Sequence, residues 1–354
     1  MVYLIEEDFG VFKGEPVKKY TWQSESGFRV SVISYGAIIQ SVLVPDKNGK
    51  LSDVVFGFDD LQGYVERNNY NFGTTVGRCA NRIRDASFQI DGVTYQLAKN
   101  DRVNPQNHLH GGVVGFAKVN WKTTVNGKKV ICSYHSKDGE EGYPGDLVTN
   151  VVYDVTDDGA INIEYTAVTT KKTVVNLLNH SYFNLAGHET GVKELYNHVL
   201  TINADKITES DRDELPTGRF ISVTDTFYDF RIPARLGDVM VKNERLIASN
   251  YCINSYSKND LTFASRIKHP QSGRSLEVFS NQPGLQVYTA TALAGPGQPG
   301  HVGKSGVEYR KYGGICLETQ NYPDAVHHSN FPSPILIPGD VYKHRLVYKF
   351  AVEK

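Results

Sequence analysis

This sequence has little of what many binding and redox chemistries require. Its 354 residues contain four cysteines and two methionines, and the 38 basic and 39 acidic residues leave a formal net charge of −1. A chain so close to neutrality offers no basic face for nucleic acid or for an anionic membrane surface. It also has no apolar stretch of about 18 residues, the length that a membrane-spanning helix needs. We therefore expect no nucleic-acid partner and no membrane partner.

The few cysteines are scattered along the chain without any C-x-x-C pair, at Cys79, Cys132, Cys252 and Cys316. Such spacing is typical of reduced thiols and not of a disulfide framework. The first ten residues, MVYLIEEDFG, carry three acidic side chains where a secretory signal has a cationic segment and an apolar run. Both observations predict a cytoplasmic protein.

Several catalytic signatures are missing as well. The chain has neither a G-x-S-x-G nucleophile turn nor an H-E-x-x-H zinc motif. The glycine-rich GPGQPG at 295–300 lacks the lysine and the following helix of a phosphate-binding loop. His108 and His110 are two residues apart, so on a strand both rings would lie on one face and could bind a metal ion. A catalytic zinc site needs a third protein ligand, and the sequence offers no obvious one. We expect no metal and no cofactor.

The pattern that is present is a period-two alternation of apolar and polar residues, which predicts β-strands. Asn-Gly and Asp-Gly pairs between such runs predict tight hairpin turns. The clearest runs cover 28–44, 93–98, 119–125 and 161–168, and the turn pairs begin at 48, 91, 126 and 158. Helical periodicity is scarce, and DLQGYVERN at 60–68 is the best candidate for a short helix.

These elements predict the fold class. Alternation of strands with helices, the pattern of a parallel α/β sheet, is absent. No Pro/Ser-rich linker, composition shift or fixed-period repeat divides the chain. We therefore expect an all-β protein: one large antiparallel β-sandwich in a single domain spanning residues 1–354.

Polar side chains gather in four short segments: GRCANRI at 77–83, NHLHGG at 107–112, NLLNHSYFNL at 176–185 and GICLETQNYPDA at 314–325. In the third, His180 lies among apolar and aromatic residues, where an unpaired polar group costs about 1–3 kcal/mol. In the fourth, an apolar strand ends in Glu318. Desolvation there raises the pKa of a carboxyl group toward values useful for proton transfer.

Each of these residues also has a structural interpretation. A histidine such as His180 is often a satisfied core residue, Glu318 fits a buried salt bridge to an arginine, and Arg82 fits a structural ion pair. From the residues alone these alternatives stay open.

Seven segments, in order, resemble the aldose 1-epimerases, also called galactose mutarotases. They are GFDDLQGY, TTVGRCANRI, NHLHGG, EGYPGDL, NHSYFNL, QPGLQVYT and LETQNYPDA. The resemblance runs through nearly the whole chain and implies the galactose mutarotase-like supersandwich, with a sugar site in a cleft. It also implies an isomerase that interconverts the α and β anomers of hexoses such as galactose and glucose.

Residue roles follow from the same resemblance. It places the general acid on His180 and the general base on Glu318, and it gives His108 no role. Asn250 is the closest counterpart of an aspartate that grips sugar hydroxyls in the family. The other sugar-binding roles fall on Asn81, Arg82, His110, Tyr182 and Gln286.

Histidine suits the acid role because its ordinary pKa of about 6.5 lets it carry a proton near neutrality. The implied partner is a small-molecule aldose, and we expect a monomer or a weak homodimer. Ala290, Thr291 and His327 depart from the family pattern, which concerns sugar preference more than chemistry. Two alternatives stay open: a non-catalytic sugar-binding or sensor protein, and a hexose-phosphate 1-epimerase, which needs extra basic residues.

Overall fold

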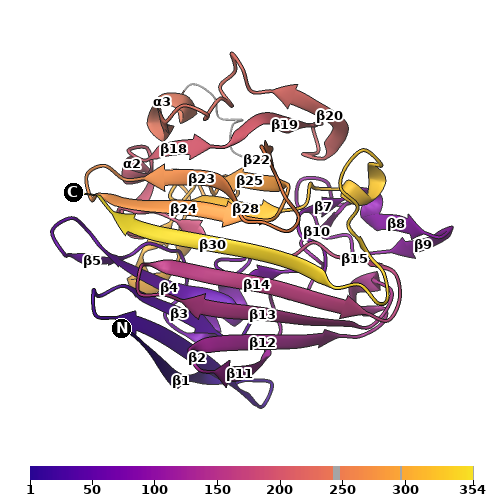
Figure 1. The fold of residues 1–354 in the computed structure, drawn as a ribbon, viewed down its shortest axis with the longest axis horizontal. Helices are drawn as coiled ribbons and strands as arrows, with labels where there is room; N and C mark the ends of the chain where they lie inside the picture. The colour runs from indigo at the N-terminus through magenta and orange to yellow at the C-terminus, as the bar shows by residue number, and fades with distance from the viewer. Residues whose placement is uncertain (242–247, 296, 354) are drawn as a thin grey trace.

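Antiparallel sheets dominate the computed structural model, which describes residues 1–241, 248–295 and 297–353 (Figure 1). One layer is a nine-stranded sheet in which the C-terminal strand β30 lies between β14 and β24. In order across the sheet, its strands are β11 (Lys122–Asn126), β12 (Lys129–Ser136), β13 (Leu147–Val155), β14 (Ala160–Thr169), β30 (Tyr342–Val352), β24 (Arg274–Ser280), β23 (Thr262–Lys268), β18 (Val199–Ile202) and β21 (Ala234–Arg235).

The second layer combines a five-stranded and a six-stranded sheet. The first holds β1 (Val2–Phe12), β2 (Glu15–Ser24), β3 (Arg29–Ile33), β4 (Ile38–Pro45) and β5 (Leu51–Asp53). The second holds, in order, β17 (Tyr182–Phe183), β28 (Ile315–Gln320), β25 (Gly284–Tyr288), β22 (Ala248–Ile253), β19 (Ala204–Ser210) and β20 (Pro216–Ser222). Backbone hydrogen bonds join the two sheets, from Phe56 N–H to Tyr182 O at 3.0 Å and from Asn184 N–H to Val54 O at 2.9 Å.

The main hydrophobic core lies between these layers. It unites Val32 of β3, Tyr153 of β13, Tyr348 of β30 and Leu317 of β28, all of them buried. Side chains alternate along a strand, so one face of β28 fills this core and the other face is available for a second purpose. The fold class predicted from the sequence, an antiparallel β-sandwich, is confirmed.

In the part of the chain that the structure describes, three short helices and several two-stranded ladders complete the fold. The helices are α1 (Leu61–Arg67), α2 (Gly191–Leu195) and α3 (Leu236–Met240), with 3₁₀ turns η1 (Arg84–Ala86), η2 (Glu140–Gly142), η3 (Lys304–Gly306) and η4 (Ala325–His327). The ladders pair β6 (Thr75–Val76) with β16 (Leu178–Asn179), β7 (Arg82–Ile83) with β10 (His108–Leu109), β8 (Ser87–Ile90) with β9 (Val93–Gln96), β15 (Thr173–Val174) with β29 (Ile335–Leu336) and β26 (His301–Val302) with β27 (Glu308–Tyr309). Within the described ranges, no helix combines the length and the apolar character that crossing a membrane requires.

Most local predictions are confirmed. All four Asn-Gly or Asp-Gly pairs close hairpins: β4–β5, β8–β9, β11–β12 and β13–β14. The expected helix at 60–68 is α1, where Asp60 Oδ1 accepts a hydrogen bond from Gly63 N–H at 2.8 Å. The run 119–125 forms a strand only from Lys122.

One predicted strand run and one of the polar segments are each divided between two strands in the structure. The run 28–44 is the hairpin of β3 and β4, because Gly36 and Ala37 adopt positive φ and turn the chain. The buried segment 176–185 forms β16 and β17, which His180 and Ser181 separate. That break is what directs His180 away from regular sheet pairing.

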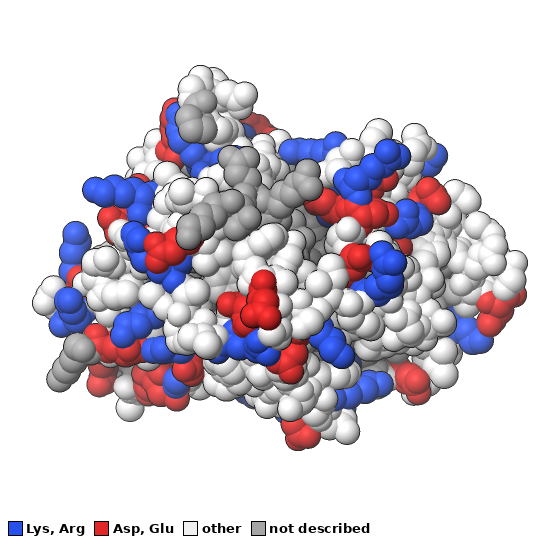
Figure 2. All heavy atoms as spheres, turned by 90° about the horizontal axis from the view of Figure 1, so that it is seen from above, with Lys and Arg blue, Asp and Glu red and all other residues white. Residues whose placement is uncertain are grey.

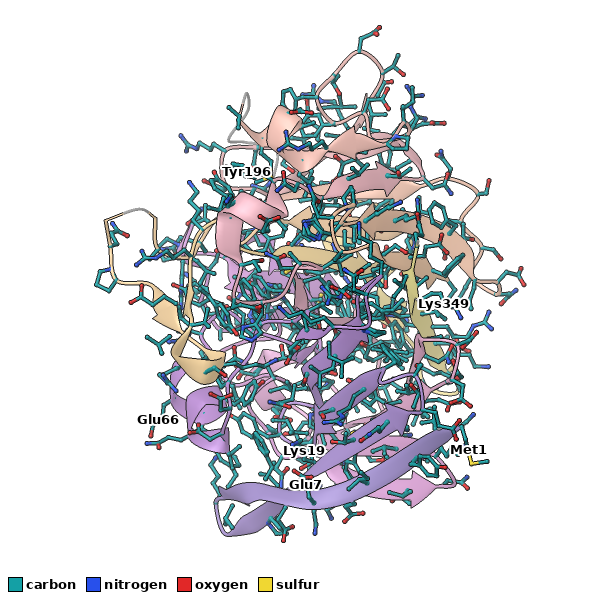
Figure 3. The ribbon with its side chains drawn as sticks, turned by 90° about the vertical axis from the view of Figure 1, so that its left-hand side faces the viewer. Met1, Glu7, Lys19, Glu66, Tyr196 and Lys349 are labelled. Carbon is teal, nitrogen blue, oxygen red and sulfur yellow. The ribbon has the colours of Figure 1, made fainter. Side chains whose placement is uncertain are left out.

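Charged side chains are mixed on the surface. On the face shown in Figure 2, basic and acidic groups are interspersed, as the near-zero net charge suggests. On the outermost hairpin, Glu7 of β1 lies beside Lys19 of β2, with Nζ and Oε1 2.9 Å apart (Figure 3). Charges on an edge strand discourage pairing with another chain.

Arg274 ties the two layers together. This buried side chain of β24 donates from Nε to Val44 O at 3.0 Å, from Nη1 to Leu185 O at 2.9 Å and from Nη2 to Lys50 O at 2.8 Å. It thereby connects the nine-stranded sheet to the β4–β5 hairpin of the other layer.

Replacing this side chain by Arg274→Met should destabilise the protein by about 3 kcal/mol, because buried carbonyl groups lose their donors. Urea unfolding followed by circular dichroism measures the change. Arg212→Met is the control, since the Arg212 side chain is 94% exposed and its loss should change stability by less than about 0.5 kcal/mol. Equal unfolding midpoints for Arg274→Met and the parent would contradict this account.

Candidate functional site

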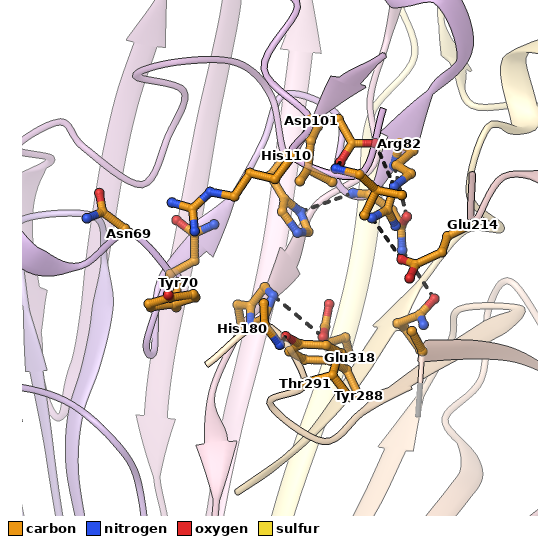
Figure 4. A pocket seen from close by; sticks show the side chains of 18 of the residues that line it. Asn69, Tyr70, Arg82, Asp101, His110, His180, Glu214, Tyr288, Thr291 and Glu318 are labelled. Carbon is orange, nitrogen blue, oxygen red and sulfur yellow. Dashed lines mark hydrogen bonds and ion pairs between the residues drawn. The ribbon is translucent and has the colours of Figure 1, made fainter. Parts of the chain in front are cut away.

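One cavity gathers residues from the polar segments singled out in the sequence, and their side chains converge on it (Figure 4). It lies on the face of the six-stranded sheet opposite the main core, because Glu318 lines it while the next residue, Leu317, packs in the core. In its floor, Gln286 of β25 lies directly opposite Glu318 of β28, and Tyr288 lies opposite Cys316. These four side chains share one face because residues two apart on a strand point the same way. Their neighbour Leu317 points into the core.

His180 reaches this floor from the break between β16 and β17. Its backbone N–H donates to Thr74 O at 2.9 Å, and its carbonyl accepts from Gly73 N–H at 3.0 Å. Its ring stacks on Tyr182 at a centroid distance of 5.1 Å and an interplanar angle of 20°. Nε2 then lies 3.6 Å from Glu318 Oε1. The predicted acid and base therefore meet in one cavity, close enough to contact neighbouring oxygens of one sugar.

The facing wall comes from the ladder of β7 and β10, which brings Asn81 and His110 together. The backbone N–H of Asn81 donates to His110 Nδ1 at 3.2 Å, and Asn81 Nδ2 donates to Gln286 Oε1 at 3.2 Å. Because Nδ1 accepts, the neutral His110 ring carries its proton on Nε2. Burial lowers the pKa of His110 well below its ordinary value, so the ring is a neutral hydrogen-bond donor.

The glycine after His110 is required by this packing. Gly111 has φ +82°, and a Cβ atom there would lie 1.8 Å from the carbonyl oxygen of Gly77. The LHGG sequence therefore lets two backbone segments approach closely enough to hold the wall of the cavity.

Arg82 fits both interpretations that the sequence left open, a residue of the sugar site and a member of a structural ion pair. It lines the cavity, and it is also held by two carboxylates, with Nε 2.9 Å from Asp101 Oδ2 and Nη2 2.8 Å from Glu214 Oε2. Neither carboxylate was predicted as a site residue. Glu214 has no sequence signal, since only the fold brings its loop to β7.

The cavity has a volume of about 360 Å³, within the range of small-molecule sites. Of the predicted site residues, those that line it are Asn81, Arg82, His110, His180, Tyr182, Gln286 and Glu318. The remaining lining residues, which sequence analysis did not assign to the site, are Asn69, Tyr70, Asn71, Asp101, Arg102, Val103, Leu109, Glu214, Ala248, Tyr288, Thr291 and Ala292. Tyr288 carried a usable signal, because it lies two residues beyond Gln286 on an alternating strand.

Asn250 is placed differently from the other predicted residues. It pairs with Gln286 in the β22–β25 ladder, and its Oδ1 accepts a hydrogen bond from Gln320 Nε2 at 3.3 Å. Among the described residues that line the cavity, β22 contributes Ala248, two positions earlier on the same face. Asn250 therefore lies next to a lining residue, Gln286, without lining the cavity itself.

Burial sets the protonation of the central pair. It raises the pKa of Glu318 from 4.5 to about 8, and it lowers the pKa of His180 from 6.5 to about 4. Both shifts follow from desolvation of the charged form. The carboxyl shift was predicted. The expectation that His180 carries a proton near neutrality is corrected, because the buried ring gives up its proton more easily than an exposed one.

His108 lies outside the cavity. Its Nδ1 is 2.7 Å from Ala98 O and its Nε2 is 2.7 Å from the hydroxyl of Tyr143, so both nitrogens have partners. The two rings of His108 and His110 do not share a face, because His110 follows the end of β10 with φ +53°. His108 is a satisfied structural histidine.

Sequence comparison places this chain in a known family. The family described as Aldose 1-epimerase matches residues 18–349. The galactose mutarotase of Bos taurus is 44% identical over 337 residues, which cover 95% of this chain and 94% of the relative. The galactose mutarotase of Homo sapiens is 42% identical, with 96% and 95% covered. The aldose 1-epimerase of Escherichia coli is 30% identical, with 96% and 97% covered.

Solved structures agree in fold. A GalM/aldose epimerase homologue from C. elegans superposes with a TM-score of 0.85 at 28% identity, covering 100% of both chains. A galactose 1-epimerase from Lactobacillus acidophilus gives a TM-score of 0.83 at 24% identity, again covering 100% of both chains. This chain belongs to the aldose 1-epimerase family of isomerases.

Proposed function

We propose that this protein interconverts the α and β anomers of free aldoses such as galactose and glucose. The observation that carries the proposal is the pair formed by His180 and Glu318 in one buried cavity, with Nε2 and Oε1 3.6 Å apart. Anomer exchange requires one group that removes a proton and one that supplies a proton, and this pair provides both.

In the proposed reaction, Glu318 removes the proton of the C1 hydroxyl while His180 gives a proton to the ring oxygen. The bond between C1 and the ring oxygen breaks, and C1 becomes an aldehyde carbon. Rotation about the C1–C2 bond exposes the other face of the aldehyde. Closure reverses both proton transfers, so Glu318 and His180 return to their starting states and no other reactant is consumed.

The pKa values of the pair, about 8 for Glu318 and about 4 for His180, support this cycle. Between these pH values the pair holds one proton in total, and in the protein without sugar this proton lies on Glu318. Ring opening starts from the tautomer in which the proton has moved to Nε2 of His180, which leaves Glu318 as the carboxylate base and His180 as the acid. Burial favours the arrangement with a neutral carboxyl and a neutral ring. That arrangement is the one that follows ring opening, so the cavity stabilises the open-chain intermediate.

Other lining groups have positioning roles in this proposal. His110 donates from Nε2, and Arg82, fixed by Asp101 and Glu214, offers the N–H groups that these two carboxylates leave free; both donate hydrogen bonds to oxygens on which negative charge develops. Tyr182 and Tyr288 offer the sugar ring an apolar surface. Gln286, oriented by Asn81, binds a sugar hydroxyl. For Asn250 we propose an indirect contribution through Gln320, with which it is hydrogen-bonded.

We propose further that residues 1–354 form one domain, acting in the cytoplasm as a monomer or weak homodimer. The four cysteines are free, which fits a reducing compartment. A neutral aldose fits the cavity better than a hexose phosphate, because the two arginines of the lining, Arg82 and Arg102, are accompanied by the carboxyl groups of Asp101, Glu214 and Glu318.

The Glu318→Gln variant should lose mutarotation by about 10²-fold or more, because the amide cannot accept the C1 hydroxyl proton. Polarimetry of freshly dissolved α-galactose and α-glucose measures the rate. Glu66→Gln is the matched control: this exposed residue of α1 makes the same chemical change away from the cavity and should keep the parent rate. A Glu318→Gln variant as fast as the parent would show that another group is the base.

The same assay tests the sensor alternative. If the parent protein binds sugar but does not accelerate mutarotation, the sensor alternative is supported.

The mutarotation rate of the parent protein should have a bell-shaped dependence on pH. Activity is expected to fall as pH drops through about 4, where the pair takes up a second proton, and as pH rises through about 8, where it loses its last one. Initial polarimetric rates, corrected for buffer catalysis, test this. They should be measured from roughly pH 3.5, below the pKa of His180, to roughly pH 9.5, above the pKa of Glu318. A rate that stays level through pH 8 contradicts the assigned pKa of Glu318.

The pH dependence of the free energy of unfolding should also report the raised pKa of Glu318. Its pKa is raised on folding, so between about 4.5 and 8 the folded state keeps a proton that the unfolded state has released. The free energy of unfolding of the parent should therefore fall with rising pH in this window, relative to Glu318→Gln. Urea titrations of both proteins at several pH values measure the difference. A difference that does not change with pH would refute the raised pKa.

A further inference from the structure

Cys316 contacts the proposed acid from the side opposite the base. Its Sγ lies 3.6 Å from His180 Nδ1, whereas Glu318 Oε1 lies 3.6 Å from Nε2 of the same ring. Cys316 and Glu318 are two residues apart on β28 and share the cavity face of the sheet. The imidazole is therefore held between a thiol and a carboxyl group.

This geometry distinguishes between two uses of the three side chains. Their donor atoms lie within 4.8 Å of one another, a grouping that also occurs in metal sites. A metal ion binds a histidine through one nitrogen, at about 2.0–2.1 Å, and its other ligands gather around that nitrogen. Here the sulfur and the carboxylate oxygen face different nitrogens. The arrangement is that of a hydrogen-bonded chain through the ring.

The thiol keeps its proton in this position. Cys316 is fully buried between its ladder neighbours Tyr182 and Tyr288, and burial raises its pKa well above the ordinary value. A protonated thiol donates a weak hydrogen bond through S–H and accepts one at sulfur. It can therefore remain the partner of Nδ1 whether that nitrogen carries a proton or not.

We propose that Cys316 is a positioning residue: by bonding Nδ1 of His180, its sulfur stabilises the protonated ring and leaves Nε2–H as the proton delivered to the sugar. The proposal rests on the acid role of His180 proposed above. This role gives a reason for the thiol of Cys316 on the cavity face of β28, where its sulfur contacts His180 Nδ1. Without the sulfur, the protonated ring would lose one charge-assisted hydrogen bond at Nδ1.

The other groups that face His180 do not replace this contact. The ring of His110 is 5.2 Å away between centroids, and Tyr288 is 6.4 Å away, both edge to face. Tyr182 stacks on the ring, and its hydroxyl donates to Tyr70 O at 3.0 Å. Glu318 faces Nε2.

Three substitutions separate the hydrogen bond from packing. Cys316→Ser keeps a group that donates and accepts, Cys316→Ala removes it, and Cys316→Val restores apolar volume without it. We expect kcat for mutarotation to fall about tenfold in the Ala and Val variants, as loss of one hydrogen bond to a charged group predicts. The Ser variant should recover most of the parent kcat, and KM should stay within about twofold in all three, because the sugar contacts come from other residues.

A second readout does not depend on activity. In protein labelled with ¹⁵N-histidine, the ring signals of His180, identified by their loss in His180→Gln, give its pKa over the pH range in which circular dichroism shows the folded protein. That pKa should be lower in the Ala and Val variants than in the parent, and close to the parent in the Ser variant.

Two outcomes would overturn the proposal. One is an unchanged pKa of His180 in the Ala variant. The other is activity that follows side-chain volume, with Val close to the parent and Ser as impaired as Ala. These failures are distinct from failure of the proposed function, which would appear as full mutarotation by Glu318→Gln while the pKa of His180 still responded to Cys316.

Discussion

Desolvation of two ionisable side chains in one cavity is the constraint on which this site depends. A carboxyl group and an imidazole are each driven toward the neutral form when they are buried. Glu318 therefore keeps a proton to a pKa of about 8, and His180 releases one at a pKa of about 4. The pair holds one proton across the intervening range. No further cofactor is needed to make one partner an acid and the other a base, since the environment alone separates their pKa values.

The fold produces this environment by using both faces of one sheet. Leu317 and Leu285 pack into the core between the layers, while Glu318 and Gln286, their neighbours in the chain, face the cavity. Rigid strands thus hold the base, and the loop that interrupts β16 and β17 brings His180 to it. Polar groups in the wall hold one another in place, with Asn81 bound to both His110 and Gln286. The cost of burying polar atoms is offset because most of them have partners.

The sequence predicted the parts of this arrangement that local patterns control. Alternation and Asn-Gly or Asp-Gly turns indicated the hairpins, and an apolar strand ending in Glu318 indicated a desolvated carboxyl group. Contacts between distant loops could not be predicted in this way: the carboxylate of Glu214 reaches Arg82 only through the fold. Asn250 shows a related limit. The sequence suggested a residue type at the cavity, and strand register does place Asn250 on the cavity face beside Gln286, but its amide oxygen bonds Gln320 and, of these two residues of β22, Ala248 is the one that lines the cavity. The expectation for the proton on His180 was wrong because it used the ordinary pKa of histidine and left out the desolvation that its apolar neighbours cause.

The most direct test of this account observes the carboxyl group of Glu318 itself. In protein labelled with ¹³C at the glutamate side-chain carboxyl, the signal of Glu318 is the one missing from Glu318→Gln. The account predicts that this signal has the position of a neutral carboxyl group at pH 6 and moves to that of a carboxylate as pH passes about 8. A signal already at the carboxylate position at pH 6, with no titration near 8, would contradict it.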